Sequence, residues 1–123
     1  MIAVMHPLAT LADLDAAVER SHERPIVIFK HSATCGTSVM ALGEIEDFVA
    51  GRPAADVFIA SVQSASRVTA EIAARFRVRH ESPQALIVNR GVVLWHASHF
   101  RISRERLVAA LASVAPPPVL STP

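Results

Sequence analysis

The sequence predicts a single α/β domain with a central mixed four-stranded sheet flanked by about four helices. Its length of 123 residues fits one compact domain. Short β-branched and aromatic runs alternate with segments whose apolar residues recur at helical spacing. The last two runs are separated by a tight turn. We expect the domain to occupy residues 1–115, followed by a flexible Pro-rich tail over 116–123.

The first helix is predicted over about residues 10–21. Thr10 and Asp13 resemble the two members of a capping box at its start. Its apolar residues recur at helical spacing: Leu8, Leu11, Leu14 and Val18.

The next segments predict a strand, a helix and a second strand. The apolar run 26–29 is typical of a strand buried on both faces and ends in the polar residues 30–34. Helical spacing begins at Cys35 and stops before Gly51, while 57–62 forms another apolar run. A strand–helix–strand unit of this length predicts parallel pairing with a right-handed crossover. The apolar stripe of the helix is expected to consist of Val39, Leu42, Ile45 and Val49.

The second half of the chain predicts a third helix, a hairpin and a last helix. Residues 68–76 have apolar side chains at intervals of four, and Pro83 introduces two short strands separated by residues 89–91. The last helix begins at Ser103, with Ile102 and Leu107 placed as a hydrophobic staple. This order of elements is that of the thioredoxin fold.

Cys35 is the candidate catalytic residue, since it is the only cysteine and follows a buried strand at the start of a helix. Sites of open α/β sheets gather beyond the carboxyl ends of strands. Backbone N–H groups and the helix dipole favour a thiolate there, and the thiolate is the nucleophile of disulfide exchange. The ordinary alternative is a small buried cysteine. Lys30 and His31 add positive potential if their side chains point toward the sulfur.

Ser38 stands where a two-cysteine redox motif carries its second thiol. Its hydroxyl cannot resolve a mixed disulfide, but it is able to donate a hydrogen bond to the thiolate and lower its pKa. The other candidate thiolate-stabilising or substrate-binding residues of this segment are Thr34, Gly36 and Thr37.

Two later segments complete the candidate site. In the predicted fold a proline that opens the third strand commonly has a cis peptide bond. Such a bond at Pro83 presents the backbone of the preceding residue, Ser82, to substrate. The alternative is an ordinary trans proline at the start of a strand. The returning hairpin strand brings Ser98 and His99 to the same end, where His99 is able to contact a substrate carboxylate. A metal site at His96 and His99 lacks a third ligand, so no metal is expected.

Three separated motifs resemble the YtxJ-like monothiol bacilliredoxins, and the similarity covers about residues 26–111. The motifs are Phe29-Lys30-His31-Ser32 leading to Thr34-Cys35 and Ser38, Ser82-Pro83-Gln84-Ala85, and Trp95-His96-Ala97-Ser98-His99. The family more often has proline and an aliphatic residue after its cysteine, where this chain has Gly36 and Thr37.

The resemblance implies a thioredoxin fold and removal of bacillithiol, or a similar low-molecular-weight thiol, from protein mixed disulfides. Cys35 corresponds to the reactive cysteine of the family. The partners implied are S-thiolated proteins and the small thiol as co-substrate, with no tightly bound cofactor and a monomer or weak dimer as the working form.

Other function classes remain open at this stage. Cys35-Gly36-Thr37-Ser38 also resembles the Cys-Gly-Phe-Ser motif of monothiol glutaredoxins, which hold an iron–sulfur cluster between two subunits. A non-catalytic binding module of the same fold is the third possibility. No histidine lies in a recognisable hydrolase context.

Composition limits the partners and the compartment. The formal net charge is +1 without a basic cluster, which argues against nucleic acid. No apolar run approaches the roughly 20 residues that a spanning helix needs. A single cysteine cannot form an internal disulfide, and residues 1–18 lack a signal-peptide pattern, so we expect a cytoplasmic protein.

Overall fold

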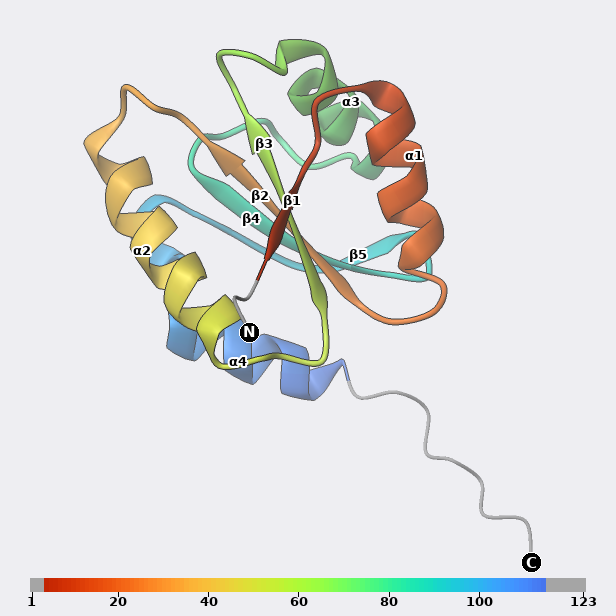
Figure 1. Ribbon diagram of the computed structural model, residues 1–123, viewed down its shortest axis with the longest axis vertical. Helices are drawn as coiled ribbons and strands as arrows, with labels where there is room; N and C mark the ends of the chain where they lie inside the picture. Colours follow the sequence, from red (N-terminus) through yellow and green to blue (C-terminus); the bar gives the residue numbers. More distant parts are fainter. Residues whose placement is uncertain (1–3, 115–123) are drawn as a thin grey trace, which may run out of the picture.

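The computed structural model describes residues 4–114, which form a mixed sheet with helices on both faces (Figure 1). The sheet has five strands in the order β1-β3-β2-β4-β5. The strands are β1 (Met5–Pro7), β2 (Ile26–His31), β3 (Asp56–Ser61), β4 (Gln84–Asn89) and β5 (Val92–Ser98). The helices are α1 (Leu11–Arg20), α2 (Gly36–Ala50), α3 (Ser66–Phe76) and α4 (Arg104–Ser113), with a short 3₁₀ helix η1 (His99–Arg101). The expected tail, 116–123, lies outside the described residues.

The pairing of the strands gathers several chain segments at one end of the sheet. Strand β3 pairs with β1 and β2 in parallel, whereas β4 is antiparallel to both β2 and β5. Gln84 lies opposite Lys30 on one side and opposite Ser98 on the other. The end of β2, the start of β4 and the end of β5 therefore meet at the same end of the sheet.

The sheet separates two apolar cores. Alternate residues of a strand point to opposite faces. In β2, Ile26 and Ile28 therefore pack with α1 and α3, whereas Val27 and Phe29 pack with α2 and α4. All four side chains are fully buried, which confirms a strand covered on both faces. Figure 1 shows the two helix pairs on opposite sides of the sheet.

The predicted helix starts are confirmed by their caps. At α1, Thr10 Oγ1 accepts a hydrogen bond from the N–H of Asp13 at 3.1 Å, and the Asp13 carboxylate accepts one from the N–H of Thr10 at 3.0 Å. At α4, Ser103 Oγ accepts from the N–H of Arg106 at 3.1 Å. Ile102 and Leu107 are both buried, as a hydrophobic staple requires.

Three predictions about local structure were wrong. The sheet has a fifth strand, β1, and Leu8 belongs to the segment after it, where its N–H donates to the carbonyl of Ile59. Leu11 is 40% exposed and Val39 is 61% exposed, so neither belongs to a buried stripe. Strand β2 continues through Lys30, which is a buried strand residue and not part of a polar loop.

None of the described helices combines the length and apolar character that a membrane crossing needs.

Candidate functional site

Cys35 is the residue at which the chain changes from the loop after β2 into helix α2. It is the N-cap of α2, with an extended backbone at φ −106° and ψ 122°, and its side chain is partly exposed. A sulfur at this position lies beside the backbone N–H groups of the first turn of the helix. Among them, the N–H of Ser38 also donates to the carbonyl of Cys35 at 3.0 Å. The structure therefore places the only thiol of the chain at the predicted helix terminus, within reach of solvent.

Hydrogen-bond donors lower the pKa of the Cys35 thiol below its ordinary value. The backbone N–H of Ser38 has the largest effect and that of Thr37 the next, with smaller contributions from the two hydroxyl groups; partial burial opposes them. The side chain makes no capping hydrogen bond in the structure, so these donors act chiefly on the ionised sulfur. Neither Lys30 nor His31 is among the causes.

Ser38 has a structural contact in addition to this effect. Its hydroxyl is fully buried, and the oxygen accepts a hydrogen bond from the backbone N–H of Ser32 at 3.1 Å. The inward orientation of Ser38 in turn places Val39 on the exposed side of α2. Ser38 thus joins the first turn of α2 to the loop that precedes Cys35.

Lys30 and His31 point to opposite faces of the sheet. Lys30 is completely buried on the α1 and α3 side, where its Nζ lies 3.3 Å from Nδ1 of His80. Burial lowers the pKa of the Lys30 ammonium to about 8, against an opposite effect of the Glu81 carboxylate. His31 lies on the α2 side, with its ring centroid 5.8 Å from that of Phe29. The interpretation that Lys30 acts on the Cys35 sulfur is therefore not supported.

The segment before β4 carries the cis peptide bond that the sequence left undecided. The bond between Ser82 and Pro83 is cis. The carbonyl of Pro83 accepts a hydrogen bond from the backbone N–H of His99 at 3.0 Å, which ties the end of β5 to the start of β4. The Ser82 hydroxyl is buried and has no hydrogen-bond partner within residues 4–114.

His99 and the 3₁₀ helix η1 form one wall of two cavities. His99 has a positive φ of 55°, which is uncommon for a residue with a side chain. A cavity of about 270 Å³ lies between η1 and α2, and its lining includes Thr37, Glu44, His99 and Phe100. Because Thr37 is two residues from Cys35, this cavity extends from the first turn of the helix that the cysteine caps.

The second cavity beside η1 is polar. It has a volume of about 390 Å³ and is lined by Glu81, Ser98, His99, Phe100 and Arg101. Nδ1 of His99 lies 3.8 Å from the Glu81 carboxylate. The hydrogen bond from Ser98 is the largest of the effects that lower the pKa of Glu81, so this carboxyl group is ionised near neutral pH. The cavity thus combines a carboxylate with a guanidinium and an imidazole.

Thr34 and Gly36, the remaining predicted site residues, flank Cys35 without an evident role at the sulfur. Oγ1 of Thr34 lies 3.3 Å from the Ser32 hydroxyl and accepts a hydrogen bond from Nε2 of Gln63. A Cβ atom built on Gly36 meets nothing within 4 Å, so space does not require a glycine there.

Sequence reasoning missed four residues that contribute to this end of the molecule: Gln63, Glu81, Phe100 and Arg101. Gln63 follows β3, whose carboxyl end lies beside that of β2 because the two strands are parallel. Functional sites gather at the carboxyl ends of parallel strands, and this rule is a signal that identifies Gln63 from the sequence. Nothing in the sequence indicates that η1 forms or that Phe100 is 76% exposed.

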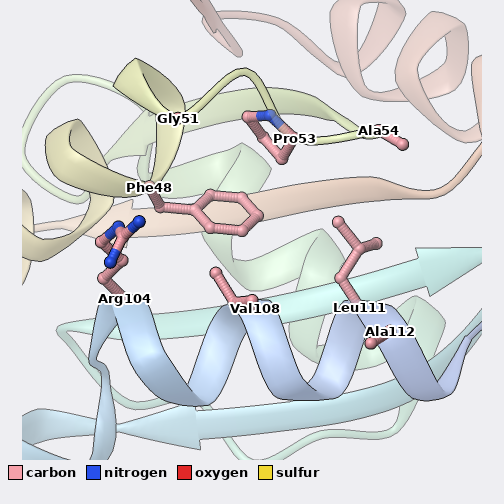
Figure 2. A pocket seen from close by; sticks show the side chains of 8 residues that line it. All are labelled: Phe48, Gly51, Pro53, Ala54, Arg104, Val108, Leu111 and Ala112. Carbon is pink, nitrogen blue, oxygen red and sulfur yellow. The ribbon is translucent and has the colours of Figure 1, made fainter.

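One apolar cavity is remote from Cys35. It measures about 480 Å³ and lies between the C-terminal end of α2 and α4 (Figure 2). Phe48 and Gly51 are at its α2 end, and helix α2 is 15 residues long, so about 20 Å separates it from the N-cap. Figure 2 shows Val108 and Leu111 facing Phe48 across the cavity. This cavity is therefore not part of the thiol site.

Comparison with solved structures identifies the fold. A thioredoxin-fold structure to which an oxidoreductase function has been provisionally assigned is 28% identical, with a TM-score of 0.80, and the match covers 87% of this chain and 93% of that one. Thioredoxin from Trypanosoma brucei brucei is 14% identical with a TM-score of 0.76, covering 93% of both chains. Thioredoxin from Fasciola hepatica is 18% identical with a TM-score of 0.72, covering 89% of this chain and 98% of that one.

A family model then identifies the chain more closely. The model described as monothiol bacilliredoxin BrxC matches residues 6–107, which include the loop of Cys35, the cis proline and the end of β5. The single cysteine agrees with a monothiol family. The expected thioredoxin fold is confirmed, with five strands in place of four. The chain belongs to the monothiol bacilliredoxin family and is a thiol–disulfide oxidoreductase.

Proposed function

We propose that Cys35 removes a low-molecular-weight thiol, bacillithiol or a similar molecule, from protein mixed disulfides in the cytoplasm. The observation that carries the proposal is the sulfur at the N-terminus of α2, partly exposed and with a lowered pKa. An ionised and accessible sulfur is what nucleophilic attack on a disulfide requires. Membership of a monothiol bacilliredoxin family supports the same chemistry.

The exchange proceeds in two steps. The Cys35 thiolate attacks the small-thiol sulfur of the mixed disulfide, which forms a new S–S bond and releases the protein sulfur as a thiolate that takes a proton from solvent. A second molecule of the small thiol, as its thiolate, then attacks the adduct at the sulfur of the bound small thiol. Cys35 leaves as the thiolate, and the two small thiols depart as their disulfide. The repaired protein gains two electrons, and the two small thiols lose them.

The polar cavity beside η1 supports an acidic small thiol as the co-substrate. Arg101 and His99 present cationic or hydrogen-bonding groups to a carboxylate, and Glu81 presents an acceptor to an amine. The neighbouring cavity that includes Thr37 connects this region to the helix that Cys35 caps. We infer that a small thiol joined to Cys35 extends its charged groups toward η1.

The test is intact-mass detection of Cys35 adducts after incubation with disulfides of bacillithiol, glutathione and coenzyme A. Wild-type protein is expected to gain the mass of one small thiol, fastest with bacillithiol, and to release that thiol from an S-thiolated model protein. Cys35→Ser is expected to do neither while keeping its circular dichroism spectrum. Exchange that persists in Cys35→Ser would reject the proposal, and a faster reaction with another small thiol would reject bacillithiol as the preferred one.

A further inference from the structure

Gln63, in the loop after β3, forms hydrogen bonds with three consecutive residues of the loop that precedes Cys35. Its Nε2 donates to the Ser32 hydroxyl at 2.8 Å and to the Thr34 hydroxyl at 3.3 Å. Its Oε1 accepts from the backbone N–H of Ala33 at 3.2 Å. Because a backbone N–H can only donate, this last contact fixes which way the amide group faces.

These contacts complete the hydrogen bonding of the loop 32–34, which has few other hydrogen bonds. The N–H of Ser32 donates to Ser38 Oγ, and the N–H of Cys35 donates to the carbonyl of Ser32 at 3.4 Å. The N–H of Ala33 has Gln63 as its partner. One side of the loop is thus held by α2, through Ser38, and the other side by Gln63.

The Gln63 side chain is solvent-exposed, so water competes for its hydrogen bonds. A long polar side chain at such a position ordinarily extends into solvent, because ordering it costs conformational entropy. Gln63 instead contacts residues about 30 positions away in the sequence, through both ends of its amide group. The loop 32–34 fixes the backbone of Cys35, and a small displacement of a reacting group costs a large factor in rate.

We propose that Gln63 is a positioning residue for thiol exchange: it holds the loop 32–34 so that the Cys35 sulfur stays against the N-terminus of α2. The proposal rests on Cys35 being the reactive thiol. The hydrogen bonds of Gln63 go to the loop and not to the Cys35 sulfur. Its effect reaches Cys35 through the backbone of Ala33 and the side chains of Ser32 and Thr34.

The test compares two variants of Gln63 with a neighbouring control. Gln63→Leu removes all three hydrogen bonds at nearly constant size. Gln63→Glu retains acceptors for the Ala33 N–H and for both hydroxyl groups, which are able to donate, but adds a negative charge. Ser64→Ala alters the adjacent exposed residue, whose side chain has no hydrogen bond within the described part of the chain. Each protein is alkylated with iodoacetamide across a range of pH, and amide hydrogen exchange of Ala33 is followed by NMR.

Gln63→Leu is expected to lower the alkylation rate at pH 7 by about three- to tenfold, the factor that loss of one ordinary hydrogen bond represents. Its rate profile is expected to shift to higher pH, and Ala33 to exchange faster, while the melting temperature falls by no more than about 5 °C. Gln63→Glu is expected to keep slow Ala33 exchange and to recover the wild-type rate at high salt, which screens its charge. Ser64→Ala is expected to match the wild type.

A wild-type rate profile and wild-type Ala33 exchange in Gln63→Leu would overturn the proposal. Partial unfolding of Gln63→Leu at the assay temperature that explains the whole decrease in alkylation rate would also overturn the proposal. Gln63 would then contribute only to overall stability. Failure of the proposed function is recognised separately: a wild-type Cys35 that resists alkylation near neutral pH rejects Cys35 as the nucleophile before any Gln63 variant is compared.

Discussion

The hydroxyl of Ser38 accepts a hydrogen bond from the backbone N–H of Ser32, across the loop that carries Cys35. In a two-cysteine redox protein this position of the helix holds the second thiol. Here it holds a buried oxygen that joins the first turn of α2 to the preceding loop.

Ser38→Ala is therefore expected to lower the free energy of unfolding by about 1 to 3 kcal/mol, because it leaves the Ser32 N–H without its acceptor in a buried position. The change is also expected to raise the pKa of the Cys35 thiol, since Ser38 contributes a side-chain hydrogen bond that lowers it. Urea denaturation measures the first effect and pH-dependent alkylation the second. Ser64→Ala is the matched control, and an unchanged urea midpoint in Ser38→Ala would contradict the structural role.

The acidity of Cys35 is expected to depend on hydrogen-bond donors and not on neighbouring charge. The backbone N–H groups of Ser38 and Thr37 are the largest causes of its lowered pKa. Thr37→Val removes a smaller hydroxyl contribution and is expected to move the alkylation profile to higher pH. Lys30→Met and His31→Gln are expected to leave the profile in place. A shift in Lys30→Met that salt abolishes would instead indicate a charge effect of Lys30 on the sulfur.

Buried Lys30 is expected to make the protein more stable as the pH rises from about 8 to 10.5. Its pKa is lowered from 10.5 to about 8 by burial, so the folded state loses this proton at lower pH than the unfolded state. In that window the unfolded state binds more protons, and the free energy of unfolding rises with pH. The full shift corresponds to on the order of 3 kcal/mol.

The chain suits this measurement because it has no tyrosine and Lys30 is its only lysine. Folding also shifts the pKa of the Cys35 thiol, so the comparison is made between Cys35→Ser and the double variant Cys35→Ser/Lys30→Met, unfolded with urea at several pH values. The single variant is expected to gain stability toward pH 10 and the double variant to stay level. Parallel curves for the two proteins would show that Lys30 keeps an ordinary pKa when the chain is folded.

The stability that the charged Asp13 side chain adds to the capping box of α1 is expected to disappear in acid. Hydrogen bonds from the N–H groups of Ala9 and Thr10 lower the pKa of the Asp13 carboxyl group in the folded state. Stability from a lowered carboxyl pKa is present above the unfolded pKa and disappears as pH falls through the folded pKa. Asp13→Asn is expected to be less stable than the wild type near pH 6 and equal to it near pH 2, by thermal unfolding. An equal deficit at both pH values would contradict a contribution from the charge.

Local rules predicted most of the fold because its main elements carry strong local signals. The run 26–29 is apolar at every position, and Thr10 with Asp13 marks a helix start that needs no tertiary contact. The missed strand β1 has three residues, of which two are exposed and one is a proline. It forms because β3 offers a parallel partner, and a long-range contact of that kind has no periodicity in the sequence.

The site residues that could be predicted from the sequence are those at the start of a helix or at the end of a strand. Cys35, Pro83 and Ser98 lie where the order of elements places them. Lys30 was misjudged because a charged residue at the end of an apolar run suggests a loop, whereas its aliphatic stem and its contact with His80 allow a buried strand position. The position of Gln63 after β3 is visible in the sequence, but its contacts with the loop after β2 exist only in the folded chain.

The location of Cys35 at a helix terminus means that its reactivity depends on folding. Before α2 forms, no aligned N–H groups face the sulfur, and the cysteine of an incomplete chain has ordinary acidity. The lowered pKa of Cys35 is therefore a property of the folded chain, and it is expected to disappear when α2 unfolds. In the purified protein, the pH dependence of Cys35 alkylation is thus expected to report whether the first turn of α2 is formed.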